Sequence, residues 1–275
     1  MLYKKIRLSY KLMIKFVKSS KTLRSIIRKL NIGSFEFRLN MNALKRMQYA
    51  FICFNAAKLA KKLGYNQISI IEYGVAGGLG LLILEEHAAE IEKFFNINID
   101  IYGFDSEEGL PEPKDYRDLP YHWKKGFYPM NKTRLEKKLK RSKLIIGNIE
   151  NTSKTFFSNY NPSPIGAVIH DFDYYSSTKT ALSMMHENEK FFLPRVFSYF
   201  DDTIGSEIEL YNDFTGERLA INEFNENSKN IKICAPYYLR AQKKEVWHEQ
   251  IWICHFFKHE KYNFFIGEQN QKLDI

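Results

Sequence analysis

The chain has 275 residues, 44% of them hydrophobic, and a formal net charge of +9. This composition supports a large core and excludes a disordered or collagen-like chain. Cys53, Cys234 and Cys254 lie far apart without metal-ligand spacing, so we expect free thiols and no disulfide framework. No uncharged apolar run reaches 18 residues, and we expect a soluble, cytoplasmic protein without a secretory signal.

The positive charge is concentrated at the start of the chain. Residues 1–46 contain thirteen Lys or Arg and a single acid, Glu36, so the rest of the chain is slightly acidic. Apolar residues at helical spacing between Ile6 and Val17, and again between Leu23 and Leu30, predict two basic amphipathic helices. We therefore expect a helical extension, 1–46, followed by one main domain, 47–275.

The role of the basic extension stays open from the sequence. It could dock on its own domain, contact a second subunit in a homo-oligomer, or lie through residues 1–30 on the anionic inner face of a membrane. Its near absence of acids also fits a transit peptide. Transit peptides are rich in Arg, however, and here Lys outnumbers Arg. Because the main domain is slightly acidic and shows no nucleic-acid-binding module, we expect no nucleic-acid partner.

Beyond the extension, helices and strands are expected to alternate. A helix from Ala43 to Leu63 precedes a short β-branched run, 67–72, which predicts a buried strand. A helical stretch, 79–95, and an alternating strand, 97–105, follow. A strand, a helix and a strand in this order are typical of a parallel sheet.

Five more strands are expected further along the chain. They span 143–147, 165–170, 195–200, 231–235 and 251–256. One helix, centred on 178–186, precedes the strand at 195–200, and another follows Gly216. The pattern predicts an α/β fold with a doubly wound, mostly parallel sheet of seven strands.

A glycine-rich turn joins the first strand to the next helix and reads Glu72-Tyr73-Gly74-Val75-Ala76-Gly77-Gly78. Small residues let the backbone approach a ligand, and the first N–H groups of a helix are unpaired. The glycines do not follow G-x-G-x-x-G, and the acid that ends the second strand, Asp105, lies 31 residues after Gly74. The turn therefore departs from the dinucleotide fingerprint.

S-adenosylmethionine is the alternative ligand for this turn. The Asp105 carboxylate could accept two hydrogen bonds from the ribose diol. Glu72, at the entrance of the turn, could face the cationic amino-acid end of the cofactor. By itself, a glycine-rich turn of this kind can also be purely structural.

Two later strands end in carboxylates. One is followed by Asp171 and Asp173, and the next by Asp201 and Asp202. If these strands are neighbours, the acids converge at the edge where open α/β sheets bind ligands, and they would repel one another without a cation. Oxygen ligands without Cys or His indicate a hard cation such as Mg²⁺. The sequence leaves open whether Asp173 is a ligand or a helix cap.

Six segments match, in order, the motifs of one known family. They are IEYGVAGG (71–78), YGFDSEEGLPEP (102–113), WKKGFY (123–128), IIGNIENT (145–152), HDFDYYSST (170–178) and FDDT (200–203). In these segments the chain resembles the macrocin O-methyltransferase family, and the resemblance implies a class I methyltransferase-like Rossmann fold. The family usually has a glycine pair before the strand that ends in Asp-Asp, whereas this chain has residues 192–195 there. The family also often has an aromatic residue after Asp-Asp, where this chain has Thr203. These departures concern the substrate pocket.

The resemblance implies roles for individual residues. Glu72, Gly74, Gly78 and Asp105 would belong to the S-adenosylmethionine site, and Asn148 would lie near the adenine. The expected site also includes Ala76, Gly77, Ser106 and His170. The resemblance makes Asp171, Asp201 and Asp202 the ligands of Mg²⁺ or another hard divalent cation. Asp171 is also the candidate catalytic base.

The segment 107–130 is too long for a tight connection and is rich in proline and aromatic residues. It predicts a lid that excludes water and selects the acceptor. Its aromatic faces suit sugar rings. His122, within the lid, is a candidate second catalytic base.

Together these features predict an S-adenosylmethionine-dependent, Mg²⁺-dependent O-methyltransferase. Its acceptor would be a small hydroxylated molecule, expected to be a carbohydrate of a glycan or natural product. A cation would stabilise the developing alkoxide while Asp171 accepts the proton. The alternative is a non-catalytic S-adenosylmethionine-binding module whose basic arm mediates assembly or membrane-surface contact.

Overall fold

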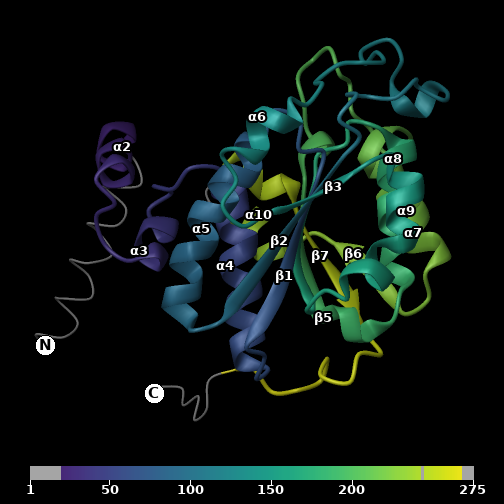
Figure 1. Ribbon diagram of the computed structural model, residues 1–275. Helices are drawn as coiled ribbons and strands as arrows, with labels where there is room; N and C mark the ends of the chain where they lie inside the picture. Colours follow the sequence, from purple (N-terminus) through teal and green to yellow (C-terminus); the bar gives the residue numbers. More distant parts are fainter. Residues whose placement is uncertain (1–19, 243–244, 268–275) are drawn as a thin grey trace, which may run out of the picture.

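Runs of β-branched and aliphatic residues form the strands of one sheet. The computed structural model describes residues 20–242 and 245–267, in which seven strands lie in the order β3-β2-β1-β4-β5-β7-β6 (Figure 1). The strands are β1 Gln67–Tyr73, β2 Asn98–Asp105, β3 Lys143–Ile146, β4 Ile165–His170, β5 Phe192–Phe200, β6 Ile231–Cys234 and β7 Ile251–Phe256. β7 is antiparallel to β5 and β6, and the other neighbours are parallel. This confirms the predicted class I methyltransferase-like Rossmann fold.

Helices cover both faces of the sheet (Figure 1). On one face lie α4 Met47–Lys62 and α5 Leu79–Phe95, and on the other lie α7 Ile149–Tyr160, α8 Tyr175–Ser183 and α9 Gly216–Asn227. Successive strand residues alternate between the faces, so Ile70 packs in the core under α4 and α5, whereas Ile71 packs in the opposite core. Two short helices, α6 Lys132–Glu136 and α10 Tyr237–Arg240, complete the domain.

Three elements have a boundary that differs from the sequence prediction by more than one residue. The helix predicted from Ala43 begins at Met47, because Arg46 adopts a left-handed conformation with φ of +39°. β5 begins three residues earlier than predicted, since Phe192 and Leu193 are buried and extend the strand into the core. The helix predicted at 178–186 spans Tyr175–Ser183 and ends in a 3₁₀ turn.

The described part of the basic extension packs on the domain. The second predicted amphipathic helix is present as α2 Lys21–Lys29, whereas the first, Ile6 to Val17, lies outside the described residues. A further helix, α3 Phe35–Asn40, was not predicted. Three apolar side chains from this segment join the core around α4 and α5: Phe35, Leu39 and Leu44. This segment before residue 46 therefore packs against the main domain, and the predicted division at residue 46 stays a prediction.

The cysteines are free thiols: Cys53 and Cys254 are buried, and Cys234 is exposed. Within 20–242 and 245–267, none of the helices is both long and apolar enough to cross a membrane.

Candidate active site

The carboxyl ends of the parallel strands surround a cavity of about 520 Å³. β1 continues into α5 on one face of the sheet and its neighbour β4 continues into α8 on the other, which creates the crevice where doubly wound folds bind ligands. Eight of the predicted cofactor residues line this cavity: Glu72, Gly74, Ala76, Gly77, Gly78, Asp105, Ser106 and Asn148. Asp171, Asp201 and Asp202 line the same cavity. The fold thus brings together the glycine-rich turn and the acidic strand ends.

Asp105 shapes the glycine-rich turn. Its Oδ2 accepts hydrogen bonds from the N–H groups of Val75 at 3.0 Å and Ala76 at 2.8 Å, and its Oδ1 accepts one from Glu107 N–H at 2.7 Å. These bonds hold Ala76 in a left-handed conformation, with φ of +46°. Each carboxylate oxygen has more than one acceptor position, so Asp105 can fix the turn and still face a ligand.

Gly74 is the point where this turn meets the acidic strand end. A Cβ atom at Gly74 would lie 1.8 Å from the backbone oxygen of Asp171. The neighbouring strands are also joined by a hydrogen bond from Asp171 N–H to the oxygen of Tyr73, at 3.1 Å. Glycine is therefore required at position 74, and its close approach places Asp171 beside the turn.

Glu72 lies under the first turn of α5 and is 2% exposed. Its Oε1 accepts a hydrogen bond from the Tyr49 hydroxyl at 2.7 Å, and it fits there because Gly80 has no side chain. In the described part of the chain, its Oε2 is buried without a hydrogen-bond partner. Burial raises the pKa of Glu72 to about 7, although the Tyr49 hydrogen bond and the charge of Arg46 lower it. A buried, unpaired carboxylate oxygen in a cavity wall is suited to a ligand's hydrogen-bond donor.

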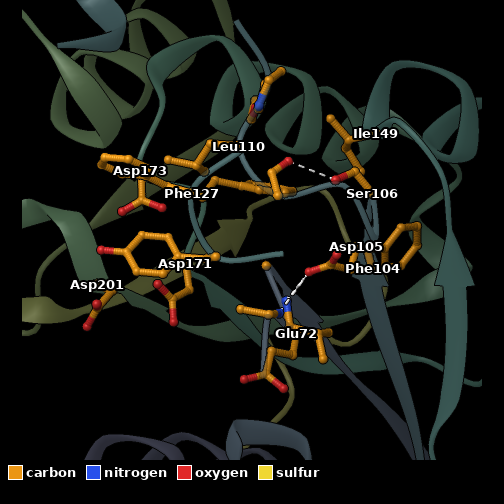
Figure 2. A pocket seen from close by; sticks show the side chains of 18 of the residues that line it. Glu72, Phe104, Asp105, Ser106, Leu110, Phe127, Ile149, Asp171, Asp173 and Asp201 are labelled. Carbon is orange, nitrogen blue, oxygen red and sulfur yellow. Dashed lines mark hydrogen bonds between the residues drawn. The ribbon is translucent and has the colours of Figure 1, made fainter. Parts of the chain in front are cut away.

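The acidic residues gather on one side of the cavity. Figure 2 shows the side chains of Asp171, Asp173 and Asp201 on this side, with Asp105 across the pocket from them. Asp202 is more deeply buried, and its two oxygens accept hydrogen bonds from Tyr211 Oη at 2.8 Å and Asp173 N–H at 2.9 Å. The convergence predicted from the two strand ends is therefore present.

Repulsion within this acidic cluster is strong. Burial, followed by the charges of Asp201 and Asp202, raises the pKa of Asp171 well above its ordinary value. Burial and the charge of Asp202 raise the pKa of Asp173 in the same way. A further carboxyl group, that of fully buried Glu217, accepts a hydrogen bond from Asp202 N–H at 2.9 Å. Such a cluster holds either protons or a cation.

Asp173 does not cap the helix that follows it. The residue that precedes α8 as its N-cap is Tyr174, and the Ser176 N–H in the first turn of that helix donates its hydrogen bond to Asp118 Oδ1 at 2.8 Å. Asp173 instead lines the cavity in a left-handed conformation, with φ of +62°. This geometry favours a functional role for its carboxylate over a capping role.

The chemistry of the acidic cluster fits a hard divalent cation, because its exposed donor atoms are carboxylate oxygens. Within the residues that the structure describes, no three Asp, Glu, His or Cys side chains are grouped closely enough to hold a metal ion as they stand. Asp171, Asp173, Asp201 and Asp202 all line the cavity. Mg²⁺ remains a prediction.

Neither predicted histidine lies in the cavity wall. His170 is fully buried in the core, its ring stacks on Phe200 at 4.1 Å, and burial lowers its pKa to about 3. His122 packs against Trp123 and lies 3.8 Å from a carboxylate oxygen of Glu209. The structure therefore places both side chains outside the cavity wall, and the cofactor role of His170 and the base role of His122 stay predictions. The sequence placed His170 at a strand end but could not show that its side chain points into the core.

The predicted lid does form part of the cavity wall. Leu110, Trp123, Phe127 and Tyr128 line the cavity from the 107–130 segment. A second loop meets this segment where the Tyr121 hydroxyl donates a hydrogen bond to the backbone oxygen of Glu209 at 2.6 Å. The lid is thus held over the acidic side of the site.

Three residues at the site were not found from the sequence. Arg46 and Glu209 line the cavity, and Glu217 lies directly behind Asp202. None of them belongs to a motif, and each comes from a segment far from the glycine-rich turn. A lone acid or base in a helix or loop gives no signal from which such a position could be inferred.

Comparisons with known proteins give structural likenesses only. No protein-family model matches the chain, and no curated protein is similar to it. A crystal structure of CalS11, a calicheamicin methyltransferase, matches with 18% identity and a TM-score of 0.49, covering 73% of this chain and 80% of that one. An O-methyltransferase from Bacillus cereus in complex with SAH matches with 11% identity and a TM-score of 0.41, covering 86% and 98%. Likenesses this distant say nothing about the substrate of this chain.

Proposed function

We propose that the protein is an S-adenosylmethionine-dependent O-methyltransferase. The observation that carries the proposal is the cavity in which the glycine-rich turn, Glu72 and Asp105 face the acidic cluster of Asp171 and Asp201. A methyl donor and a hydroxyl acceptor must meet in one site, with the acceptor oxygen aligned behind the methyl group. A cavity with a nucleoside-binding side and a proton-accepting side meets this requirement.

The turn residues would hold the cofactor. Asp105, already fixed by the turn, is placed to accept hydrogen bonds from a ribose diol. Asn148, which caps α7 through a 2.8 Å bond from Glu150 N–H, and Ser106 line the wall proposed for the adenine. Glu72 offers its unpaired Oε2 to the ammonium group of the amino-acid end.

The acidic side would activate the acceptor. Asp171 lines the cavity next to Gly74, where its carboxylate can accept the proton of the attacking hydroxyl. Asp201 and Asp202, with Asp171, are the proposed ligands of Mg²⁺ or a similar divalent cation. When bound, such a cation would stabilise the negative charge that develops on the acceptor oxygen.

The proposed acceptor is a small hydroxylated molecule, with a carbohydrate as the favoured class. Support comes from the cavity wall, where aromatic side chains, Trp123, Phe127 and Tyr128, lie near carboxylates. Aromatic faces and carboxylates are suited to the apolar faces and hydroxyl groups of a sugar ring.

The test measures methyl transfer from labelled S-adenosylmethionine to a panel of nucleotide sugars and glycans, with and without EDTA. Asp171→Asn should reduce the rate by about 100-fold or more while the affinity for S-adenosylhomocysteine stays unchanged, because the proton acceptor and a proposed cation ligand are lost but the residues that would hold the cofactor are kept. Asp213→Asn, at a half-exposed carboxylate paired with Arg218, is the matched control. Restoration by Mg²⁺ after EDTA would support the metal, and an EDTA-insensitive activity would remove it.

The same experiment addresses the alternative. A non-catalytic module would bind S-adenosylhomocysteine but transfer no methyl group to any acceptor in the panel, and Asp171→Asn would change nothing.

A further inference from the structure

Arg46 places a positive charge in the cavity wall, beside Glu72. It comes from the segment before α4, outside every motif found in the sequence. Its guanidinium lies 5.0 Å from the centroid of the Tyr49 ring and donates a hydrogen bond to the Tyr49 hydroxyl at 3.0 Å. That hydroxyl in turn donates to Glu72 Oε1 at 2.7 Å. Arg46, Tyr49 and Glu72 therefore form a connected group at one end of the cavity.

Arg46 and Glu72, at the two ends of this group, each keep polar atoms that make no hydrogen bond within the described residues. In the part of the chain that the structure describes, Tyr49 is the single hydrogen-bond partner of the Arg46 guanidinium, which has five N–H donors. Glu72 is 2% exposed, and its Oε2 is buried without a partner. The cavity wall thus holds free cationic donors of Arg46 and, beside them, the unpaired, buried carboxylate oxygen of Glu72.

The unusual backbone conformation of Arg46 supports a role for this residue in ligand binding. Arg46 has φ of +39° and ψ of +69°, a left-handed conformation that arginine rarely adopts. Among the described residues, the Arg46 side chain makes no capping hydrogen bond to the first turn of α4, because a guanidinium has no acceptor atom. It turns the chain so that Arg46 faces the cavity while the next residues enter the helix.

We propose that Arg46 binds the α-carboxylate of the methionyl end of S-adenosylmethionine while Glu72 accepts hydrogen bonds from its ammonium group. This inference rests on the proposed function and assigns one end of the cofactor site. A free amino acid carries one negative and one positive group on the same carbon, and Arg46 and Glu72 supply the two complementary charges side by side. A guanidinium also matches the two oxygens of a carboxylate in a bidentate pair.

The competing explanation is that Arg46 only balances nearby acids. Its charge interacts with Glu72 and Asp171, so its loss could disturb the site without any direct contact to the cofactor. The two explanations differ in which ligands should be affected. If Arg46 binds the carboxylate directly, its loss should weaken only ligands that carry a carboxylate. If Arg46 only balances nearby acids, its loss should weaken every ligand of the site.

The test is isothermal titration of wild type, Arg46→Gln and Arg46→Lys with three adenosyl ligands. S-adenosylhomocysteine has the whole amino acid, decarboxylated S-adenosylmethionine lacks the carboxylate, and 5′-methylthioadenosine lacks both charged groups. We expect Arg46→Gln to weaken S-adenosylhomocysteine by about 10- to 100-fold and to leave the other two unchanged. Arg46→Lys should fall between wild type and Arg46→Gln, because lysine keeps the charge but loses the fork geometry. Arg28→Gln, an exposed arginine on α2, is the control and should bind all three ligands as wild type does.

Other outcomes overturn the inference. Unchanged affinity of Arg46→Gln for S-adenosylhomocysteine, or an equal loss for all three ligands, would show that Arg46 does not bind the carboxylate. Melting temperatures of each variant show whether the fold is kept, and Arg46→Lys carries the test if the Gln variant does not fold. If wild type binds none of the ligands, the proposed function itself fails; if wild type binds S-adenosylhomocysteine and the variants do too, this inference alone fails.

Discussion

At the residue scale, the site depends on a close approach between two backbones. Gly74 and Asp171 directly follow the neighbouring strands β1 and β4, and the Cβ of any other residue at position 74 would overlap the Asp171 backbone oxygen. The turn that would hold the cofactor and the carboxylate that would accept a proton are therefore positioned by one contact. A change at Gly74 should affect both binding and catalysis.

Gly74→Ala should lower the free energy of unfolding by about 3 kcal/mol or more, since the substitution adds backbone strain at φ of +77° to a collision with backbone. Chemical denaturation measures this change, and titration with S-adenosylhomocysteine should show weakened binding. Gly64→Ala is the matched control, because Gly64 has φ of +79° with no atom within 4 Å of the added Cβ. Its cost should be about 1 kcal/mol, from the conformation alone. Equal costs for the two variants would contradict the close approach.

At the scale of elements, the segment before α4 packs against the main domain. Arg38 is almost fully buried and forms an ion pair with Glu90 of α5, and Lys45 pairs with Glu86 of the same helix at 2.9 Å. The apolar residues of the segment before α4 pack in the core under α4 and α5. Arg46 ends this segment in the cavity wall, so α3 and the loop after it hold a site residue in place.

A chain that starts at residue 31 should fold and bind S-adenosylhomocysteine, whereas a chain that starts at residue 47 should not. The shorter chain loses five buried apolar side chains, Phe35, Leu39, Met41, Ala43 and Leu44, at a cost of more than about 5 kcal/mol. Thermal unfolding and ligand titration of the two truncated chains check the prediction. A stable, binding-competent chain from residue 47 would show that the segment is dispensable.

At the scale of the whole molecule, the acidic cluster links stability to pH. Its carboxyl groups come from several elements: Asp171, Asp173, Asp201, Asp202, Glu209 and Glu217. Burial, with the neighbouring acids, raises the pKa of Asp202 to about 7 and that of Asp173 to about 9. The folded protein therefore binds more protons than the unfolded chain above the ordinary aspartate pKa of about 4.

The free energy of unfolding of the metal-free protein should fall as the pH rises through about 7 and towards 9, because the proton-linked stability is complete below the unfolded pKa and is lost as these groups ionise. Denaturation curves at a series of pH values measure the slope. Asp173→Asn should flatten the upper part of this profile. A stability that does not change over this range would contradict the raised pKa values.

Added Mg²⁺ should raise the melting temperature more at high pH than at low pH, since a cation competes with protons for the same oxygens. The measurement compares melting temperatures with and without MgCl₂ across the same pH series. Asp201→Ala should reduce the Mg²⁺-dependent shift. A shift that is absent at every pH would count against the proposed metal.

The sequence by itself determined the alternation of strands and helices, the glycine-rich turn and the acids at the strand ends, because these depend on local patterns of side chains. It therefore predicted the sheet and most residues of the cavity, such as Glu72 and Asp105. Only the tertiary structure decided which way a side chain points and which distant segments meet. His170 turns into the core and Arg46 reaches the cavity from outside every motif, since packing between elements sets both positions and no local pattern records it.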